Sequence, residues 1–290
     1  MANQVRAISQ NGGIVVCAMD STCIVQEMEC IHSTSATVSA ALGRLLTGAS
    51  LMGSWLKNTE DSLTLRVNGG GPAGTLLAVC DGNGNVRGYA GNPVVEDAIR
   101  TEDGKLDVGA VTGHNGTLSV IRDLGLKEPY IGQVPLVSGE IAEDITSYYA
   151  TSEQTPTVCA LGVLVNKDLS IRKAGGFLLQ LLPGATEEEI TAIEKNIKVM
   201  PTVTELLENG GTVYDMVQLA LEGFSPDIME ERDVKYRCHC SMEKVERILI
   251  SLGREEMKKM QEENDTTTVE CHFCDKVYTV KLGDLLTEMG

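Results

Sequence analysis

The sequence predicts an α+β protein with a core of mostly antiparallel strands and packed helices, then a helical linker and a small C-terminal domain. Three observations predict this fold class. Strand-like runs joined by turns outnumber helices in residues 1–183, without the regular strand–helix alternation of a parallel sheet. Acidic segments with helical patterns follow. Four of the nine cysteines then lie within the last 53 residues.

Within the core domain, residues 1–183, the first expected feature is a hairpin. Two β-rich runs, 14–19 and 23–31, flank the turn Asp20-Ser21-Thr22, and Cys17 and Cys23 would face each other across it as reduced packing residues. Apolar residues at helical spacing predict a long helix over 35–56. The remaining expected elements are strands at 62–67, 75–80, 86–90, 118–122 and 131–135, a helix at 139–149, and a hairpin of 157–165 with 169–179.

Residues 184–235 are interpreted as a metastable helical linker that rests on the core. Helical patterns occur at 187–197, 203–207 and 213–221. Residues 186–235 contain twelve acidic and four basic side chains. Helices this short are only marginally stable unless they pack against other parts of the protein, so we expect low local stability in this segment. The alternative is that this segment is simply the C-terminal half of one larger domain.

Residues 236–290 predict a small domain of their own. A helix is expected from Ser241, then a hairpin that carries the second cysteine pair, and a short closing helix. About 55 residues bury little apolar core, and domains of this size often need a metal or another cross-link.

The four clustered cysteines predict a zinc site. Cys271-x-x-Cys274 has the spacing of a two-ligand zinc knuckle at a tight turn. Residues i and i+2 of an extended segment point to the same side, so Cys238-x-Cys240 supplies the other pair. We therefore expect one zinc ion per chain, bound by these four thiolates in a C-terminal zinc-binding domain. The two histidines inside the pairs, His239 and His272, should point away from the metal.

The C-x-C spacing also suggests redox sensitivity. Two cysteines one residue apart can close a small, strained disulfide once metal is lost, and strained disulfides are the labile ones. Zinc binding contributes on the order of 10 kcal/mol to the folding of small zinc domains, so oxidation of the ligands would unfold such a domain. Spacing alone leaves a redox switch and a static zinc site as open alternatives.

Composition excludes several classes of function. Acidic residues outnumber basic ones 41 to 24, a net charge of −17, which argues against binding nucleic acid or an anionic membrane surface. The N-terminus has no signal-peptide pattern, so we expect a soluble cytoplasmic protein whose cysteines are reduced.

Three weaker patterns are interpreted as structural. Gly69-x-Gly71-x-x-Gly74 imitates a dinucleotide fingerprint, but a strand rather than a helix is expected after it. Residues 81–85 imitate the start of a calcium loop and are predicted to form a turn. Cys159 and His114 are a conceivable nucleophile and base, yet nothing in the sequence brings them together.

A set of motifs is spread along nearly the whole chain: Ala40-Ala41-Leu42-Gly43-Arg44-Leu45-Leu46, Gly71-Pro72, Val86-Arg87-Gly88-Tyr89, Asn92-Pro93, Pro129-Tyr130-Ile131-Gly132, Ser138-Gly139-Glu140-Ile141-Ala142-Glu143-Asp144, Tyr148-Tyr149, Ser152-Glu153-Gln154 and the C-terminal cysteine motifs. In these motifs and their order the chain resembles, from end to end, the redox-regulated 33-kDa heat-shock chaperone family. His239 departs from the family, which more often has a small polar residue inside the C-x-C motif, and it is a hypothetical modulator of zinc release.

The resemblance implies a non-enzymatic, ATP-independent holdase that is inactive while reduced and zinc-bound. It implies that oxidation pairs Cys238 with Cys240 and Cys271 with Cys274, releases zinc, and unfolds the switch domain and the linker. It further implies binding of unfolding client proteins, dimerisation on activation and transfer of clients to ATP-dependent chaperones.

Two other classes of function compete with this interpretation. One is an interaction protein whose zinc knuckle docks a fixed partner and does not respond to peroxide. The other is a thiol oxidoreductase that uses Cys271 and Cys274. That chemistry prefers a cysteine at a helix start in a thioredoxin-like setting, whereas a hairpin is expected here.

Overall fold

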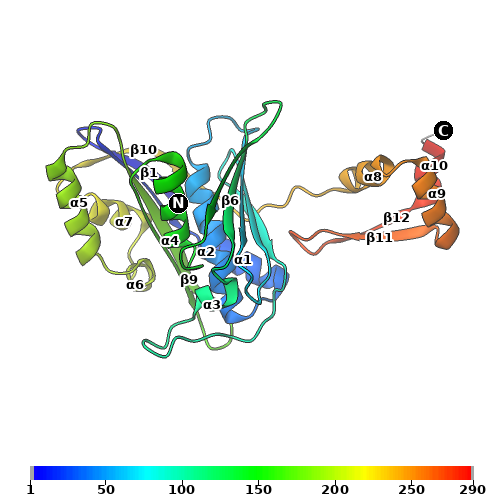
Figure 1. Ribbon diagram of the computed structural model, residues 1–290, viewed down its shortest axis with the longest axis horizontal. Coiled ribbons are helices and arrows are strands. Elements are labelled where there is room, and N and C mark those ends of the chain that lie inside the picture. Colours follow the sequence, from blue (N-terminus) through cyan, green and yellow to red (C-terminus); the bar gives the residue numbers. More distant parts are fainter. Residues whose placement is uncertain (1–2, 289–290) are drawn as a thin grey trace. The chain divides into compact units, whose positions relative to one another are not determined.

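The structure of the 290-residue chain is a computed structural model that describes residues 3–288. The chain divides into two compact units, Met1–Tyr236 and Arg237–Gly290, and each is considered by itself. Figure 1 labels their elements. Among the described residues, no helix combines the length and the apolar character needed to cross a lipid bilayer.

The first unit contains two five-stranded antiparallel sheets, one in the order β10-β1-β2-β9-β8 and one in the order β5-β4-β3-β6-β7. Its elements are β1 (Gln4–Ser9), β2 (Ile14–Asp20), α1 (Thr22–His32), α2 (Ala36–Gly53), β3 (Ser62–Asn68), β4 (Leu76–Asp81), β5 (Val86–Ala90), α3 (Val108–Thr112), β6 (Thr117–Asp123), β7 (Tyr130–Pro135), α4 (Ala142–Tyr148), the π-helical turn η1 (Tyr149–Glu153), β8 (Thr157–Val165), β9 (Ile171–Leu181), α5 (Glu187–Val199), α6 (Val203–Glu208), α7 (Val213–Ala220) and β10 (Pro226–Arg232). The predicted α+β class with largely antiparallel sheets is confirmed.

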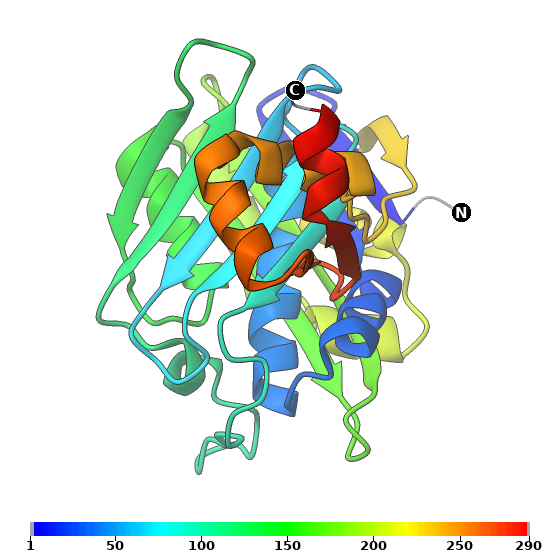
Figure 2. The same ribbon diagram turned by 90° about the vertical axis from the view of Figure 1, so that its right-hand side faces the viewer.

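Helix α2 lies between the two sheets (Figure 1), and Figure 2 shows the second sheet, in cyan to green, with α2 in blue behind it. Nearly every residue of α2 is buried, because the helix is covered on both sides. Its small residues permit this close packing: a Cβ on Gly53 would lie 2.3 Å from the sulfur of Cys80. The carboxylate of Asp97 accepts hydrogen bonds from the N–H and the hydroxyl of Thr37 and so holds the N-terminus of α2.

The predicted hairpin of 14–19 with 23–31 is wrong in its second half, which forms α1 instead of a strand. Ile24, Val25 and Met28 are buried on one face of α1, a helical spacing that the β-branched residues obscured. The supposed turn is a helix start, where the Asp20 carboxylate accepts the N–H of Thr22 at 3.0 Å. Cys17 is buried on β2 and Cys23 is exposed on α1, so they do not face each other across a hairpin.

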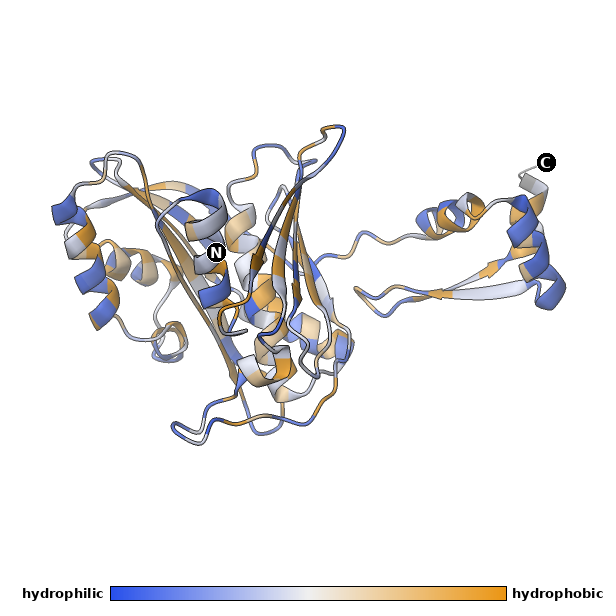
Figure 3. Cartoon of the chain, viewed as in Figure 1, coloured by the Kyte–Doolittle hydropathy of each residue, from blue (hydrophilic) through white to orange (hydrophobic). Residues whose placement is uncertain are grey.

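Residues 184–235 form α5, α6 and α7, close to the predicted ranges, followed by β10, which was not predicted. Each helix begins with a capping box, formed by Thr186 with Glu189, Thr202 with Glu205, and Thr212 with Asp215. The helices pack on the outer face of the first sheet, and α5 turns its hydrophilic residues outward (Figure 3). Strand β10 pairs with β1 along the edge of that sheet.

The second unit contains α8 (Met242–Ser251), α9 (Arg254–Glu263), β11 (Thr266–Glu270), β12 (Val277–Lys281) and α10 (Leu282–Glu288). Strands β11 and β12 form the expected hairpin, while α9 was not predicted. The apolar cluster of this unit is small. Its buried members are Val245, Leu249, Met257, Tyr278, Val280, Leu282, Leu285 and Leu286. Eight buried side chains are a modest core, as expected for a domain that needs further support.

Candidate metal centre

The first cysteine pair lies in the irregular segment that leads into α8. The hydroxyl of Ser241 caps this helix by accepting the N–H of Lys244 at 3.3 Å. The ammonium of Lys244 donates to the carbonyl oxygen of His239 at 2.7 Å. These two contacts fix the backbone at His239, between the two cysteines, and at Ser241, directly after Cys240.

The second pair occupies the tight turn between β11 and β12. The carbonyl of Cys271 accepts the N–H of Cys274 at 3.1 Å and the N–H of Asp275 at 2.8 Å, and Asp275 has a left-handed backbone with φ of 52°. The N–H of Cys271 donates to the carbonyl of Lys276 at 3.1 Å. This geometry turns the chain so that both thiols of the C-x-x-C motif lie on one side.

The four sulfur atoms meet in one cluster. They all lie within 4.8 Å of one another and could hold a metal ion. The Sγ atoms of Cys238 and Cys271 are 3.6 Å apart, and those of Cys240 and Cys274 are 3.3 Å apart. These short distances connect the two segments, so a bound ion would cross-link α8 to the β-hairpin.

The cluster sits at the border of the unit's apolar core. All four cysteines are half-buried, and Cys240 and Cys271 pack against the apolar cluster. The hydroxyl of Tyr278 on β12 donates to the sulfur of Cys240 at 3.0 Å. Loss of the cluster would therefore disturb the packing around it.

The pKa values of the clustered thiols are shifted in different directions. Burial opposes ionisation of Cys240, but the hydroxyl of Tyr278 and the neighbouring thiols outweigh it and lower the pKa of Cys240 to about 7. Burial and the hydrogen bonds with the three other cysteines raise the pKa of Cys274. Burial also raises the pKa of Cys238. Four thiolates together would require a cation to balance them.

Sequence reasoning missed Tyr278. It is the fourth residue after Cys274, in a strand that alternates exposed and buried residues. Such alternation places Tyr278 and Val280 on the buried side of the strand, and this pattern could have identified Tyr278 from the sequence.

The histidines and the remaining cysteines lie outside the sulfur cluster. Among the described residues, the group that could hold a metal consists of the four cysteines, without His239 or His272. The ring of His272 is exposed. The other cysteines are Cys17 and Cys80, which are buried, Cys23 and Cys30, which are exposed, and Cys159, which is half-buried.

The weaker patterns have structural explanations, as predicted. The glycines of 69–74 precede strand β4, and a Cβ on Gly69 would lie 2.1 Å from the carbonyl oxygen of Gly113. Residues 81–85 form a turn in which the Asp81 carboxylate accepts backbone N–H groups of Asn83 and Asn85. Cys159 lies on β8 in the first sheet, whereas His114 precedes β6 in the second.

Similarity to known proteins extends over nearly the whole chain. Residues 3–281 match the family model described as "Hsp33 protein". The chain is 45% identical to a 33 kDa chaperonin of Clostridium perfringens (strain SM101 / Type A) over 287 residues, 98% of this chain and 91% of that protein. It is 44% identical to a 33 kDa chaperonin of Clostridium botulinum (strain 657 / Type Ba4) over 285 residues, 97% of this chain and 96% of that protein.

The fold is also similar to a solved structure. The crystal structure of the 33 kDa chaperonin (heat shock protein 33 homolog) of Thermotoga maritima matches with a TM-score of 0.90 and 34% identity. The match covers 100% of this chain and 99% of that one. Family model, relatives and fold agree with the cysteine motifs, and the chain belongs to the Hsp33 family.

Proposed function

We propose that this chain is a redox-regulated, ATP-independent chaperone of the reducing cytoplasm that holds unfolding proteins in a non-aggregated state. The cluster of four sulfurs carries the proposal, because it supplies a metal cross-link that oxidants can remove. Family membership supports the chaperone activity, since the relatives are named chaperonins. No catalytic turnover is part of the proposal.

The proposed metal is zinc, one ion per chain, with Cys238, Cys240, Cys271 and Cys274 as ligands. Four sulfurs about 2.3 Å from a central ion form a tetrahedron with edges of about 3.8 Å. The sulfur–sulfur distances of 3.3 and 3.6 Å and the upper limit of 4.8 Å are close to that geometry. An all-sulfur donor set is typical of structural zinc. When bound, the zinc charge would hold all four sulfurs as thiolates.

The proposed switch is oxidation by a peroxide. Four thiolates and two molecules of hydrogen peroxide, with four protons, give two disulfides and four molecules of water. The disulfides pair Cys238 with Cys240 and Cys271 with Cys274. Disulfide formation removes the thiolate donors, so the ion is released together with the cross-link between α8 and the hairpin.

Loss of this cross-link would unfold residues 236–290, and the linker 184–235 would follow. Helices α5–α7 cover an apolar face of the first sheet that includes Ala7, Val16, Phe177 and Leu179. Their release would expose that face, and exposed apolar patches are typical binding sites for other proteins. We propose that this surface binds clients, that the activated chain dimerises, and that clients pass to ATP-dependent chaperones.

The proposal predicts a defined change in metal and thiol content. Reduced protein should contain one zinc per chain by elemental analysis. After peroxide, zinc should be released, four thiols should be lost, and peptide mapping should find the two neighbouring disulfides. Retention of zinc after peroxide would contradict the switch and favour a static zinc site.

A further inference from the structure

Residues 233–236, here called the strap, follow β10 and are bound by the core domain much as a short peptide would be. Tyr236 forms a parallel β-bridge with Val86 of β5. The side chain of Val234 is only 2% exposed and belongs to the main apolar core of the first unit. The strap lies within the part of the chain that the proposed activation unfolds, so the place that it fills would become vacant in the active protein.

The core domain holds the backbone of the strap through two side-chain amides and one strand edge. The side chain of Asn3 donates to the carbonyl of Val234 at 3.0 Å and accepts the N–H of Val234 at 2.8 Å. The side chain of Asn85 accepts the N–H of Lys235 at 3.1 Å, and the N–H of Val86 donates to the carbonyl of Lys235 at 2.9 Å. Both backbone groups of two consecutive residues are therefore bound, which any residue except proline permits.

The ladder between β4 and β5 explains why β5 can bind an added segment. The N–H of Gly91 donates to the carbonyl of Thr75, and hydrogen-bonded pairs alternate along an antiparallel ladder. Val86 and Gly88 therefore direct their N–H and C=O groups away from β4. Strand β5 is an edge of the second sheet, and sheet edges recognise extended segments through such groups.

A socket in the core accepts the side chain of Val234. A Cβ on Gly84 would lie 2.7 Å from one of the methyl carbons of Val234, so the socket exists because residue 84 is glycine. Gly84 also has a left-handed backbone with φ of 87°, which favours glycine there. The socket fits a small branched apolar side chain. The next side chain, Lys235, is exposed and pairs with Asp233 of the strap itself at 3.2 Å, so the position after the socket is open to many residues.

The hydroxyl of Tyr236 completes the contact with the edge of β5. It donates to the carbonyl of Gly88 at 2.9 Å and accepts the N–H of Gly88 at 3.4 Å. Its oxygen also lies 3.3 Å from Nε2 of His32 on α1. One phenol hydroxyl thus binds the outward N–H and C=O of Gly88, which favours a tyrosine two positions after the residue in the socket.

The groups that bind the strap belong to the core domain, residues 1–183, and other core residues hold them in place. The carbonyl of Asn3 accepts the N–H of Asp20 on β2 at 2.8 Å. The carboxylate of Asp81 accepts the N–H of Asn85 at 3.0 Å and its side-chain amide at 3.2 Å. These contacts are independent of residues 184–235, so the site remains formed when the linker unfolds.

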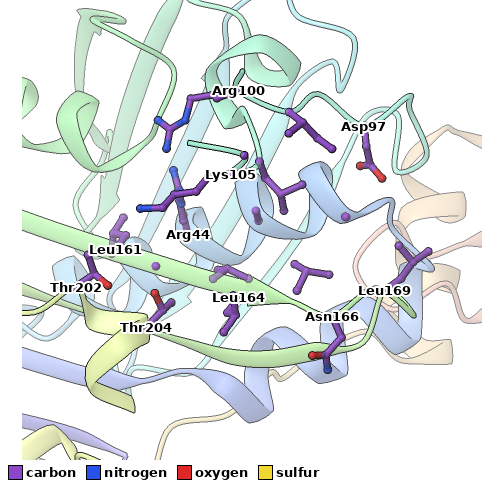
Figure 4. Close-up of a pocket in the computed structure, with 18 of the residues that line it drawn as sticks. Arg44, Asp97, Arg100, Lys105, Leu161, Leu164, Asn166, Leu169, Thr202 and Thr204 are labelled. Atoms are coloured by element: carbon purple, nitrogen blue, oxygen red, sulfur yellow. The ribbon is translucent and has the colours of Figure 1, made fainter. Parts of the chain in front are cut away.

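A cavity beside β8 does not meet this condition. Its volume is about 630 Å³, and Figure 4 shows Thr202 and Thr204 among the residues that line it. Both threonines belong to the linker, so the cavity would lose part of its wall on activation. The site of the strap has the opposite behaviour, because it becomes accessible when the linker leaves.

We propose that activation empties the site of the strap and that an extended segment of a client protein takes its place. The segment places a small branched apolar side chain in the socket at Gly84 and a tyrosine, two positions later, at Gly88. Asn3, Asn85 and Val86 bind its backbone, which makes the site tolerant of the remaining sequence. This inference rests on the proposed function, because the linker must leave before a client can enter.

The test uses the full-length protein and a fluorescein-labelled peptide with the sequence of residues 231–237. Fluorescence anisotropy should show no binding to the reduced protein, in which the strap fills the site, and saturable binding to the oxidised protein. Limited proteolysis within residues 184–235 shows independently whether the linker has been released. A released linker without peptide binding would overturn this inference and leave the proposed function intact.

The substitution Val234→Asp empties the site without oxidation. A carboxylate is unfavourable in an apolar socket, so the strap should leave the core while the protein stays reduced. The reduced variant should bind the peptide at least as tightly as oxidised wild type, where the released strap still competes from the same chain. Lys235→Asp introduces the same side chain at an exposed position and should stay closed. Absence of binding to the Val234→Asp variant would refute the site, even if oxidation failed to release the linker.

Variants of the peptide test the side-chain preference. Val234→Asp in the peptide should abolish binding, and Tyr236→Phe should weaken it about fivefold through the loss of the hydroxyl contacts. Lys235→Ala should leave the affinity unchanged, because this side chain is exposed. Equal affinities of the valine and aspartate peptides would contradict the socket.

Variants of the protein locate the site. In reduced protein that carries Val234→Asp, the further substitution Asn3→Ala removes two hydrogen bonds to the peptide backbone and should weaken binding about tenfold. Asn115→Ala, at an exposed asparagine outside the site, is the control and should have no effect. Equal affinities of the Asn3 and Asn115 variants would place the peptide elsewhere and would refute the inference.

Competition identifies the natural occupant. Reduced and carboxymethylated α-lactalbumin, a permanently unfolded protein, should displace the labelled peptide from oxidised protein. Failure to displace it would mean that clients bind elsewhere, and the inference would be wrong. If the unlabelled peptide instead lowers the fraction of dimer in sedimentation, the strap of a second copy fills the site, which would also contradict a client as occupant.

Discussion

The hydroxyl of Tyr278 donates a hydrogen bond to the sulfur of Cys240 over 3.0 Å. This contact links the sulfur cluster to the apolar core, because Tyr278 is a buried member of that core on β12. A hydrogen bond to a metal-bound thiolate withdraws electron density from the sulfur and lowers its nucleophilicity. Tyr278 is thus placed to slow oxidation of the cluster.

Tyr278→Phe is therefore expected to accelerate zinc release under peroxide by about tenfold or more, because one hydrogen bond to a charged group is worth about 1.5–3 kcal/mol. A colorimetric zinc chelator follows the release. Tyr130→Phe, an exposed tyrosine on β7, is the control and should release zinc at the wild-type rate. Equal rates for both variants would show that the Tyr278 hydroxyl does not protect the sulfur.

Removal of the metal should unfold the second unit. Its core has few buried side chains, and zinc contributes on the order of 10 kcal/mol to domains of this kind. A strong chelator, or Cys274→Ser, should reduce the far-UV circular dichroism of α8 and α9 and make this unit sensitive to protease. Cys23→Ser, which changes an exposed cysteine on α1, should do neither. Unchanged spectra after chelation would mean that the unit folds without its ion.

Helices α5, α6 and α7 and the cysteine cluster were accessible from the sequence for local reasons. Thr186, Thr202 and Thr212 each stand three residues before an acidic residue, and this capping-box spacing, with the apolar periodicity, places helix starts correctly. The spacings around Cys238 and Cys271 are local signals as well. Their assembly into one cluster followed from the chemistry of zinc ligands.

The wrong and the missing predictions concern elements whose secondary structure is determined by tertiary contacts. Helix α1 carries Ile24 and Val25, which favour a strand locally but are buried by packing as a helix. Strand β10 contains one aspartate, two glutamates and one arginine, and it forms because β1 offers an edge for pairing.

Weakening a linker cap is expected to loosen the linker. In α7, the hydroxyl of Thr212 accepts the N–H of Asp215 at 3.3 Å, and Thr212→Ala should cost about 1 kcal/mol. Hydrogen exchange of α7 should become about fivefold faster, and activation by peroxide should need less heat. The control is Thr191→Ala, at an exposed position within α5 and away from any cap. Because alanine favours helix, this substitution should slow hydrogen exchange of α5 or leave it unchanged. Equal effects of both substitutions would contradict the role of the cap.

The buried cysteines of the first unit predict a pH dependence. Burial raises the pKa of Cys17 to about 11, from about 9 for an exposed thiol. Below pH 9 the thiol is protonated in both the folded and the unfolded state, so the stability that its burial contributes is complete. As the pH rises from 9 through 11, the thiol ionises in the unfolded chain before it does so in the folded protein, and this stability is lost. The unfolding free energy of wild type relative to Cys17→Ala should therefore fall between pH 9 and 11 in urea titrations. A constant difference would indicate that Cys17 is accessible to water.

The same burial predicts a pattern of thiol modification. In native, reduced protein at pH 8, iodoacetamide should modify the exposed Cys23 and Cys30 and spare the buried Cys17 and Cys80. Peptide mass mapping reads out each position. Modification of Cys80 at the rate of Cys23 would contradict the packing between α2 and β4.

Light scattering of a heat-unfolding client, without ATP, tests the central claim most directly. It compares reduced, zinc-loaded protein with protein oxidised by peroxide under mild heat. We expect the oxidised protein alone to suppress aggregation. Equal suppression by both forms would show that the cysteines have a structural role and do not regulate the activity. No suppression by either form would contradict the chaperone function.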